Sequence, residues 1–123
     1  MNVLGAVNDQ LEPLVSLRLR HPNSQVVQQV FALVDTGFTD LLCISTALQA
    51  SLGLKRIGVT PYRLAGGHAV RLDIVVLEVE WLGQWRKIHA VVNGGDVLLG
   101  MRALKGGVLN VQGRSGGRVT FRV

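Results

Sequence analysis

The stretch that decides the fold reads Val30-Phe31-Ala32-Leu33-Val34-Asp35-Thr36-Gly37, an apolar run that ends in a carboxylate, a hydroxyl and a glycine. Burial disfavours the charged form of a carboxyl group, so the mouth of a buried strand is rarely acidic by accident. Thr36 can hydrogen-bond to neighbouring backbone, and Gly37 permits a sharp turn and a close approach of another chain. The pattern singles out Asp35 as a candidate functional carboxyl.

The residues before this stretch predict a hairpin. Between positions 12 and 20, Val15, Leu17 and Leu19 alternate with polar side chains, which is typical of a half-buried strand. Residues 21–24, His-Pro-Asn-Ser, have turn composition, and an apolar strand over 26–34 follows. We therefore expect residues 12–34 to form a hairpin that delivers Asp35.

The residues after it predict a short strand over 40–44 and then a helix. Ser45 is a suitable N-cap and Gly53 a suitable C-cap for that helix. Strands are expected over 56–60 and 62–65, and Gly66-Gly67 indicates a hairpin turn.

The second half of the chain predicts more strands. In residues 68–82 the apolar alternation changes phase near Val76, which suggests a bulge or a sharp bend. Further strands are expected over 85–92, 96–100, 108–112 and 118–123, with a helix of one or two turns over 101–105. We expect one mainly β domain over 1–123, with one or two short helices.

Composition narrows the function classes. The chain has 123 residues, of which 48% are hydrophobic and 17% charged, so it should form a packed core. We expect no membrane segment and no secretory signal, because there is neither a long apolar run nor a basic start. The single Cys43 indicates a reducing cytoplasm and a buried apolar role.

Charge and ligand patterns argue against two further classes. The formal net charge is +5, but the basic residues are scattered along the chain, so no nucleic-acid partner is expected. A small basic β-barrel that binds nucleic acid is the weakest of three interpretations of the function, and the two stronger ones follow below. His21 and His89 have no cysteine or paired carboxylate at ligand spacing. We expect no metal and no cofactor.

The order of the predicted elements resembles one half of an aspartic protease, in particular the single-domain, retroviral-type (retropepsin-like) proteases and their bacterial relatives. Three segments carry the resemblance: Leu-Val-Asp-Thr-Gly-Phe-Thr at 33–39, Ala-Gly-Gly-His at 65–68, and Val-Leu-Leu-Gly-Met-Arg-Ala-Leu at 97–104. It covers roughly residues 12–112. The resemblance implies a closed, barrel-like half of an aspartic protease.

The resemblance also implies roles for particular residues. Asp35 would be catalytic, and Thr36 and Gly37 would support the active loop. The substrate-binding set would comprise Phe38, Thr39, Leu98 and a flap at Ala65, Gly66, Gly67 and His68, while Leu99 and Gly100 would pack behind the loop. Simpler interpretations remain open: Leu98 and Leu99 as core, Gly66-Gly67 as a plain turn, and His68 as an exposed hairpin residue.

A single Asp-Thr-Gly implies a pair of chains. Aspartic protease chemistry needs two carboxyl groups that share one proton, because like charges a few ångströms apart cannot both ionise. The second Asp35 would come from another copy of the chain about a two-fold axis. We therefore expect a homodimeric endopeptidase acting on peptides or proteins; the alternative is a dimeric, weakly active or inactive peptide-binding module.

The sequence departs from the retroviral pattern near the active loop. Phe38 stands where those enzymes carry a small residue, which should reshape the substrate channel. Thr39 and Met101 replace the acidic and basic residues of an ion pair that helps to hold the retroviral dimer, and we expect an Asp40–Arg102 contact to replace it. The first 11 residues and the tail 118–123 are expected to form the dimer sheet, since edge strands are natural pairing surfaces.

Overall fold

The computed structural model describes residues 2–63 and 66–123, and these are mainly β. The strands are β1 (Asn2–Val7), β2 (Pro13–Arg20), β3 (Gln28–Val34), β4 (Leu42–Ile44), β5 (Gly58–Arg63), β6 (Ala69–Trp81), β7 (Gln84–Val92), β8 (Leu98–Leu99), β9 (Val108–Val111) and β10 (Arg118–Arg122). The described residues add one short α-helix, α1 (Thr46–Leu52), and a 3-10 helix, η1 (Met101–Leu104). Among them, no helix combines the length and the apolar character that crossing a membrane requires.

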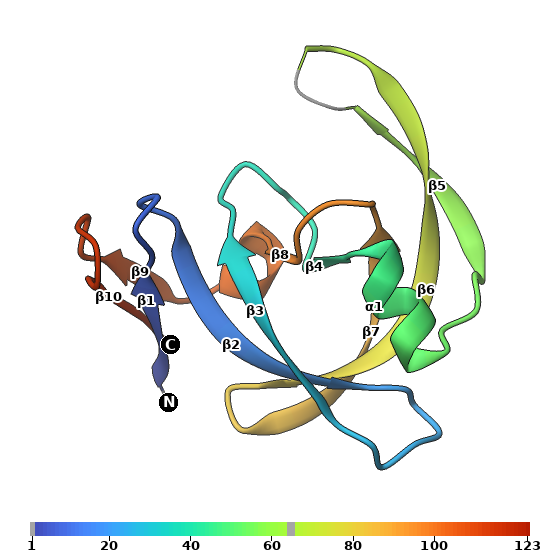
Figure 1. Cartoon of the computed structure of the whole chain (residues 1–123), viewed down its shortest axis with the longest axis horizontal. Helices are drawn as coiled ribbons and strands as arrows, with labels where there is room; N and C mark the ends of the chain where they lie inside the picture. The colour runs from blue at the N-terminus through green and yellow to red at the C-terminus, as the bar shows by residue number, and fades with distance from the viewer. Residues whose placement is uncertain (1, 64–65) are drawn as a thin grey trace.

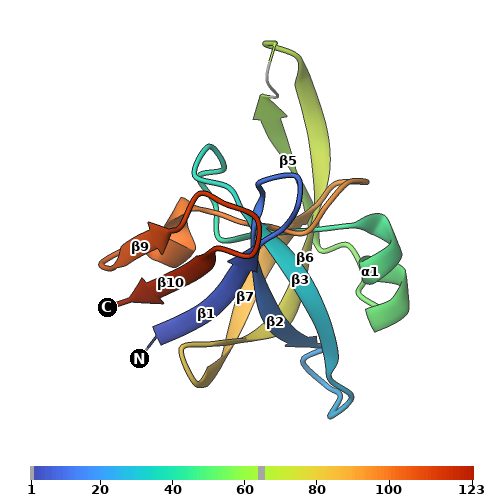
Figure 2. The same cartoon turned by 60° about the vertical axis from the view of Figure 1, so that its left-hand side comes forward.

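Six strands form a closed barrel. They follow the order β6-β7-β4-β8-β3-β2, and β2 pairs again with β6 to complete the ring (Figure 1). β5 extends the sheet beyond β6, and these two strands form a hairpin that projects away from the barrel (Figure 2). β1, β10 and β9 extend the sheet at its other end. The barrel-like fold expected from the sequence is confirmed.

One face of each long strand supplies the barrel core. The side chains of Val15, Leu17 and Leu19 in β2 are at most 3% exposed, as their alternation predicted. β6 contributes Val75 and Leu77, both 0% exposed. Full burial of one such side chain stabilises the fold by about 1.5–3 kcal/mol, so this core dominates the stability of the barrel.

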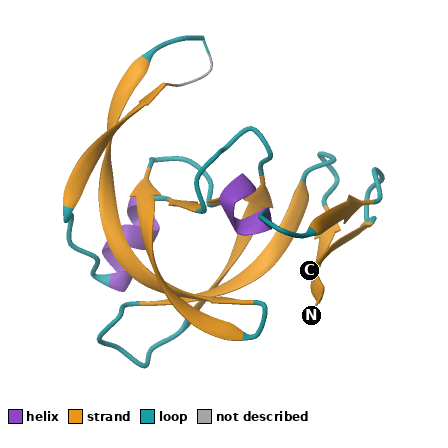
Figure 3. Cartoon of the chain, turned by 180° about the vertical axis from the view of Figure 1, so that it is seen from behind, coloured by secondary structure: helices purple, strands orange, loops and turns teal. Residues whose placement is uncertain are grey.

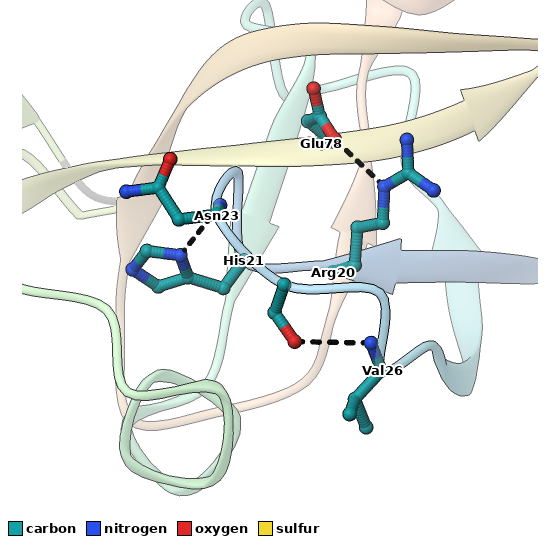
Figure 4. A network of polar contacts seen from close by, with 6 residues as sticks. Arg20, His21, Asn23, Val26 and Glu78 are labelled. Carbon is teal, nitrogen blue, oxygen red and sulfur yellow. Dashed lines mark hydrogen bonds and ion pairs between the residues drawn. The ribbon is translucent and has the colours of Figure 1, made fainter.

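Two ion pairs and a tryptophan cover the seam where β2 meets β6. Arg20 Nε lies 2.7 Å from Glu78 Oε1 (Figure 4), and Arg18 Nη1 lies 2.8 Å from Glu80 Oε2. The guanidinium carbon of Arg20 lies 3.9 Å from the ring centroid of Trp85. Because β2 and β6 share only three residue pairs, these side chains reinforce a short backbone ladder.

The hairpin predicted over 12–34 forms as expected. β2 and β3 pair in antiparallel register from Leu14–Leu33 to Leu19–Gln28. In the intervening turn the backbone N–H of Asn23 donates to His21 Nδ1 at 3.0 Å (Figure 4). His21 therefore helps to shape the turn.

The predicted helix caps are confirmed. The backbone N–H of Leu48 donates to Ser45 Oγ at 3.1 Å, and Gly53 ends the helix with a φ of 66°. A left-handed φ of this kind costs glycine little, which explains its place at the C-cap. Ser51 Oγ of α1 donates to Gln28 Oε1 at the start of β3 at 2.9 Å, which ties the helix (the longer purple coil in Figure 3) to the barrel.

The bulge suggested near Val76 does not form. β6 pairs with β7 from Asp73–Val92 to Trp81–Gln84 without interruption. The apolar residues change phase because opposite faces of the strand contact different surroundings. Val75 and Leu77 are buried in the barrel core, whereas Leu72, on the other face, lines a cleft under the hairpin. The two strands predicted over 56–65 also merge into β5, which tolerates Pro61 because it is an edge strand.

The terminal strands pair within the chain. β1 pairs with β10 from Asn2–Arg122 to Ala6–Arg118, and β10 also pairs with β9. The N-terminal strand and the tail, which the sequence assigned to a dimer sheet, thus already share one sheet in a single chain. The outer edge of that sheet is β9.

Candidate active site

Asp35 begins a loop that joins two strands separated by a third. β3 ends at Val34, β4 starts at Leu42, and β8 lies between them, parallel to β3 and antiparallel to β4. The backbone N–H of Asp35 donates to the carbonyl of Leu99 at 2.9 Å. The position of Asp35 is therefore fixed by the ladder between β3 and β8.

The first turn of the loop orients the carboxylate. The backbone N–H of Gly37 donates to Asp35 Oδ1 at 2.9 Å, and that of Phe38 donates to the Asp35 carbonyl at 3.2 Å. A Cβ atom at position 37 would lie 3.2 Å from Asp35 Oδ1, so glycine leaves room for this bond. Thr36 is exposed at the tip of the loop.

The second half of the loop rests on the chain that follows β8. Gly100 N–H donates to the Leu41 carbonyl at 3.0 Å, and Met101 N–H donates to the Phe38 carbonyl at 2.8 Å. A Cβ atom on Gly100 would lie 2.0 Å from the carbonyl oxygen of Asp40, which is far inside contact distance. Only glycine fits there without displacing the loop.

Asp35 lies on the wall of a cleft of about 820 Å³ between the loop and the β5–β6 hairpin. Its lining comprises Asp35, Gly37, Phe38, Thr39, Asp40 and Cys43 from the loop side, Thr60, Pro61, Tyr62, Arg63 and Leu72 from the hairpin, and Val91, Asn93 and Leu98. Figure 1 shows the hairpin rising beside the loop that follows β3. The arrangement leaves an open channel in which an extended chain could contact a carboxylate.

The structure divides the predicted site residues into two groups. Asp35, Gly37, Phe38, Thr39 and Leu98 line the cleft. Thr36 is exposed at the tip of the loop, and Leu99 and Gly100 are buried behind it.

The predicted flap residues lie at the far end of the hairpin. Gly66, Gly67 and His68 are exposed there and do not line the cleft. Gly66 and Gly67 have φ angles of 91° and 87°, which suit a tight turn. Ala65 lies outside the described residues.

Sequence reasoning missed the hairpin residues that do line the cleft. Thr60 pairs with Leu72, and Tyr62 pairs with Val70, so these side chains share one face of the hairpin. The signal was present in the sequence, because Val70, Leu72 and Ile74 alternate with polar residues opposite Tyr62 and Thr60. The prediction instead assigned the flap to the glycines of the turn, and not to the hairpin face that carries Thr60 and Tyr62.

The thiol of Cys43 and the ion pair of Asp40 with Arg102 have distinct environments near the cleft. Cys43 is 3% exposed where it lines the cleft, and burial raises the pKa of its thiol by more than a backbone hydrogen bond to Asn93 lowers it. The expected Asp40–Arg102 contact forms within one chain, with 3.8 Å between Oδ1 and Nη1.

Within residues 2–63 and 66–123, no three His, Cys, Asp or Glu side chains gather as a metal site would require.

Comparisons with known proteins agree on the fold. No protein-family model and no curated protein sequence matches the chain. The chain is similar in structure to a retropepsin-like aspartic protease from Rickettsia conorii, with a TM-score of 0.66 and 20% identity over 98% of this chain and 89% of that one. It is also similar to the EIAV protease complexed with the inhibitor HBY-793, with a TM-score of 0.58 and 21% identity over 76% of this chain and 86% of that one. The chain therefore has the retropepsin-like fold.

Proposed function

We propose that residues 1–123 act as one domain and that two copies form a homodimeric aspartic endopeptidase. One observation carries this proposal: Asp35, whose carboxylate accepts a hydrogen bond from the Gly37 N–H, lines a cleft of about 820 Å³. The solved structures of similar fold are described as aspartic proteases, which supports the same chemistry. Each chain supplies half of the required pair of carboxyl groups.

The mechanism follows from the shared proton. With the two Asp35 carboxyl groups close together, one stays protonated while the other is ionised. The ionised carboxylate takes a proton from a water molecule, whose oxygen attacks the peptide carbonyl carbon. The protonated carboxyl group donates its proton to the carbonyl oxygen.

The surrounding residues have supporting roles. We assign to Thr36, which is exposed in a single chain, a hydrogen bond to the partner's loop across the two-fold axis. Gly37 offers backbone to the substrate, and the β5–β6 hairpin closes over the peptide as a flap. The cytoplasm is the proposed compartment, because the single Cys43 cannot form an internal disulfide.

The decisive test is cleavage of a complex peptide library by the purified chain from acid to neutral pH, with new termini read by mass spectrometry. Asp35→Asn should lower cleavage by about 10²- to 10⁴-fold, to the level of background, because it removes the ionisable group that exchanges protons with water. Asp96→Asn is the matched control, since it removes a carboxylate from an exposed position outside the cleft.

The outcomes separate the two leading functions. Cleavage sites that are shared by wild type and Asp96→Asn but absent from Asp35→Asn establish the protease. A preparation shown to be dimeric by light scattering that cleaves nothing at any pH contradicts the proposal. Binding of library peptides by such a preparation would identify a peptide-binding module of the same fold.

A further inference from the structure

Two aromatic rings meet across the cleft. Phe38 comes from the loop that carries Asp35, and Tyr62 comes from β5 in the hairpin. Their ring centroids are 6.2 Å apart, with an interplanar angle of 37°. This is the range in which tilted aromatic pairs attract each other beyond simple burial. The pair is therefore a direct side-chain contact between the active loop and the hairpin.

The ring of Phe38 packs against the backbone at Gly100. A Cβ atom on Gly100 would lie 2.6 Å from Cδ2 of the Phe38 ring, so the ring packs directly against the backbone there. The Phe38 carbonyl also accepts the Met101 N–H at 2.8 Å. With Gly100 on one side and Tyr62 on the other, the ring forms a fixed wall of the cleft.

The rest of the apolar lining is aliphatic or sulfur-bearing. Leu98 and Leu72 are half-buried, and Cys43 and Val91 are at most 6% exposed on the floor. A substrate side chain in the cleft beside Asp35 would therefore meet both these groups and the aromatic pair. Two aromatic rings in contact within this cleft leave less of its volume for a substrate ring beside Asp35.

We propose that Phe38 and Tyr62 limit the substrate side chain beside the scissile bond to aliphatic residues of about leucine or methionine size, and that their contact holds the hairpin over the cleft. The inference rests on the proposed function and adds its substrate class. It also assigns Tyr62 as a specificity-determining residue that acts from the flap.

The first test measures specificity with a peptide series that differs only in having Leu, Phe or Trp at the residue preceding the scissile bond. Phe38→Ala should raise kcat/KM for the aromatic peptides relative to the leucine peptide by about 10- to 200-fold, because pocket size discriminates to that extent. Phe38→Leu should give a smaller increase. Phe31→Ala is the matched control, since that ring is 68% exposed and lies outside the cleft.

The second test does not need cleavage. Hydrogen exchange of the hairpin backbone, over 58–63 and 69–74, should become about 2- to 10-fold faster in Phe38→Ala and in Tyr62→Ala, as expected for the loss of one aromatic contact. Exchange in the same strands should not change in Phe31→Ala. Tyr62→Phe keeps the ring and should behave as wild type.

The results distinguish the proposed size limit from the proposed protease function on which it rests. A wild type that cleaves peptides, with an unchanged aromatic-to-leucine ratio in both Phe38 variants, overturns the size limit and leaves the protease proposal standing. Unchanged hairpin exchange in Phe38→Ala and Tyr62→Ala overturns the contact. A dimeric wild type that cleaves nothing overturns the proposed function and the size limit together. If Phe38→Ala fails to fold, Phe38→Leu and Tyr62→Ala decide the question.

Discussion

The two halves of β6 have opposite surroundings although they belong to one uninterrupted strand. Between Val75 and Trp81, every second side chain is buried in the barrel, and Glu78 and Glu80 form ion pairs with β2. Between Ala69 and Ile74, no side chain is buried, and the strand pairs mainly with the edge strand β5. One strand can therefore anchor the fold with one half and supply a wall of the cleft with the other, because each half has different partners.

Two leucine variants, one in each half of β6, test this contrast directly. Leu77→Ala, in the barrel half, should lower the free energy of unfolding by about 2–5 kcal/mol. Leu77 is 0% exposed, so the substitution removes buried apolar contacts and leaves a cavity in the core. Leu72→Ala, in the hairpin half, should lower it by about 1 kcal/mol or less. Urea denaturation measures both. Equal losses in the two variants would contradict the division of the strand.

A second prediction concerns the loop that begins at Asp35, which backbone hydrogen bonds hold against the chain that follows β8. Gly100→Ala should destabilise the chain by about 1–3 kcal/mol, because its Cβ would overlap the Asp40 carbonyl and push the loop outward. Gly94→Ala is the control, since nothing lies within 4 Å of the added Cβ. Thermal unfolding of the two variants measures the difference. If Gly100→Ala is as stable as Gly94→Ala, the loop does not depend on this close approach.

The smallest effect compares the two ion pairs of the closing seam. Arg20→Met should cost about 1–2 kcal/mol of unfolding free energy, because Arg20 is 19% exposed and also lies over Trp85. Arg18→Met should cost about 0–1 kcal/mol, because Arg18 is 51% exposed and its guanidinium carbon is 5.7 Å from the same ring. Urea denaturation at low and at high salt measures both. The reverse ranking would show that exposure does not decide the strength of this seam.

Local signals in the sequence were enough for most of the fold. Alternation at Val15, Leu17 and Leu19, the caps Ser45 and Gly53, and the turn glycines each depend on a few neighbouring residues. Those residues determined the strands, the helix and the position of Asp35 at a strand end. These predictions held because tertiary contacts reinforced the local preferences.

The features that were missed depend on contacts between distant segments. The phase change near Val76 looked like a bulge, because a single sequence does not show that the two halves of a strand face different partners. Tyr62 gave no clear sign of its place opposite Phe38, which requires the hairpin to be set over the loop. The pairing of β1 with β10 likewise depends on residues from the two ends of the chain.

The placement of β8 between β3 and β4 has a consequence for folding kinetics. Leu33 pairs with Leu98, so the two strands that fix Asp35 come from distant parts of the chain. Closing such a long loop is entropically costly and slows folding. An emerging or partly folded chain therefore carries the Asp-Thr-Gly sequence without its geometry. The proposed protease activity would therefore arise late in folding, when the barrel that shapes the cleft is already assembled.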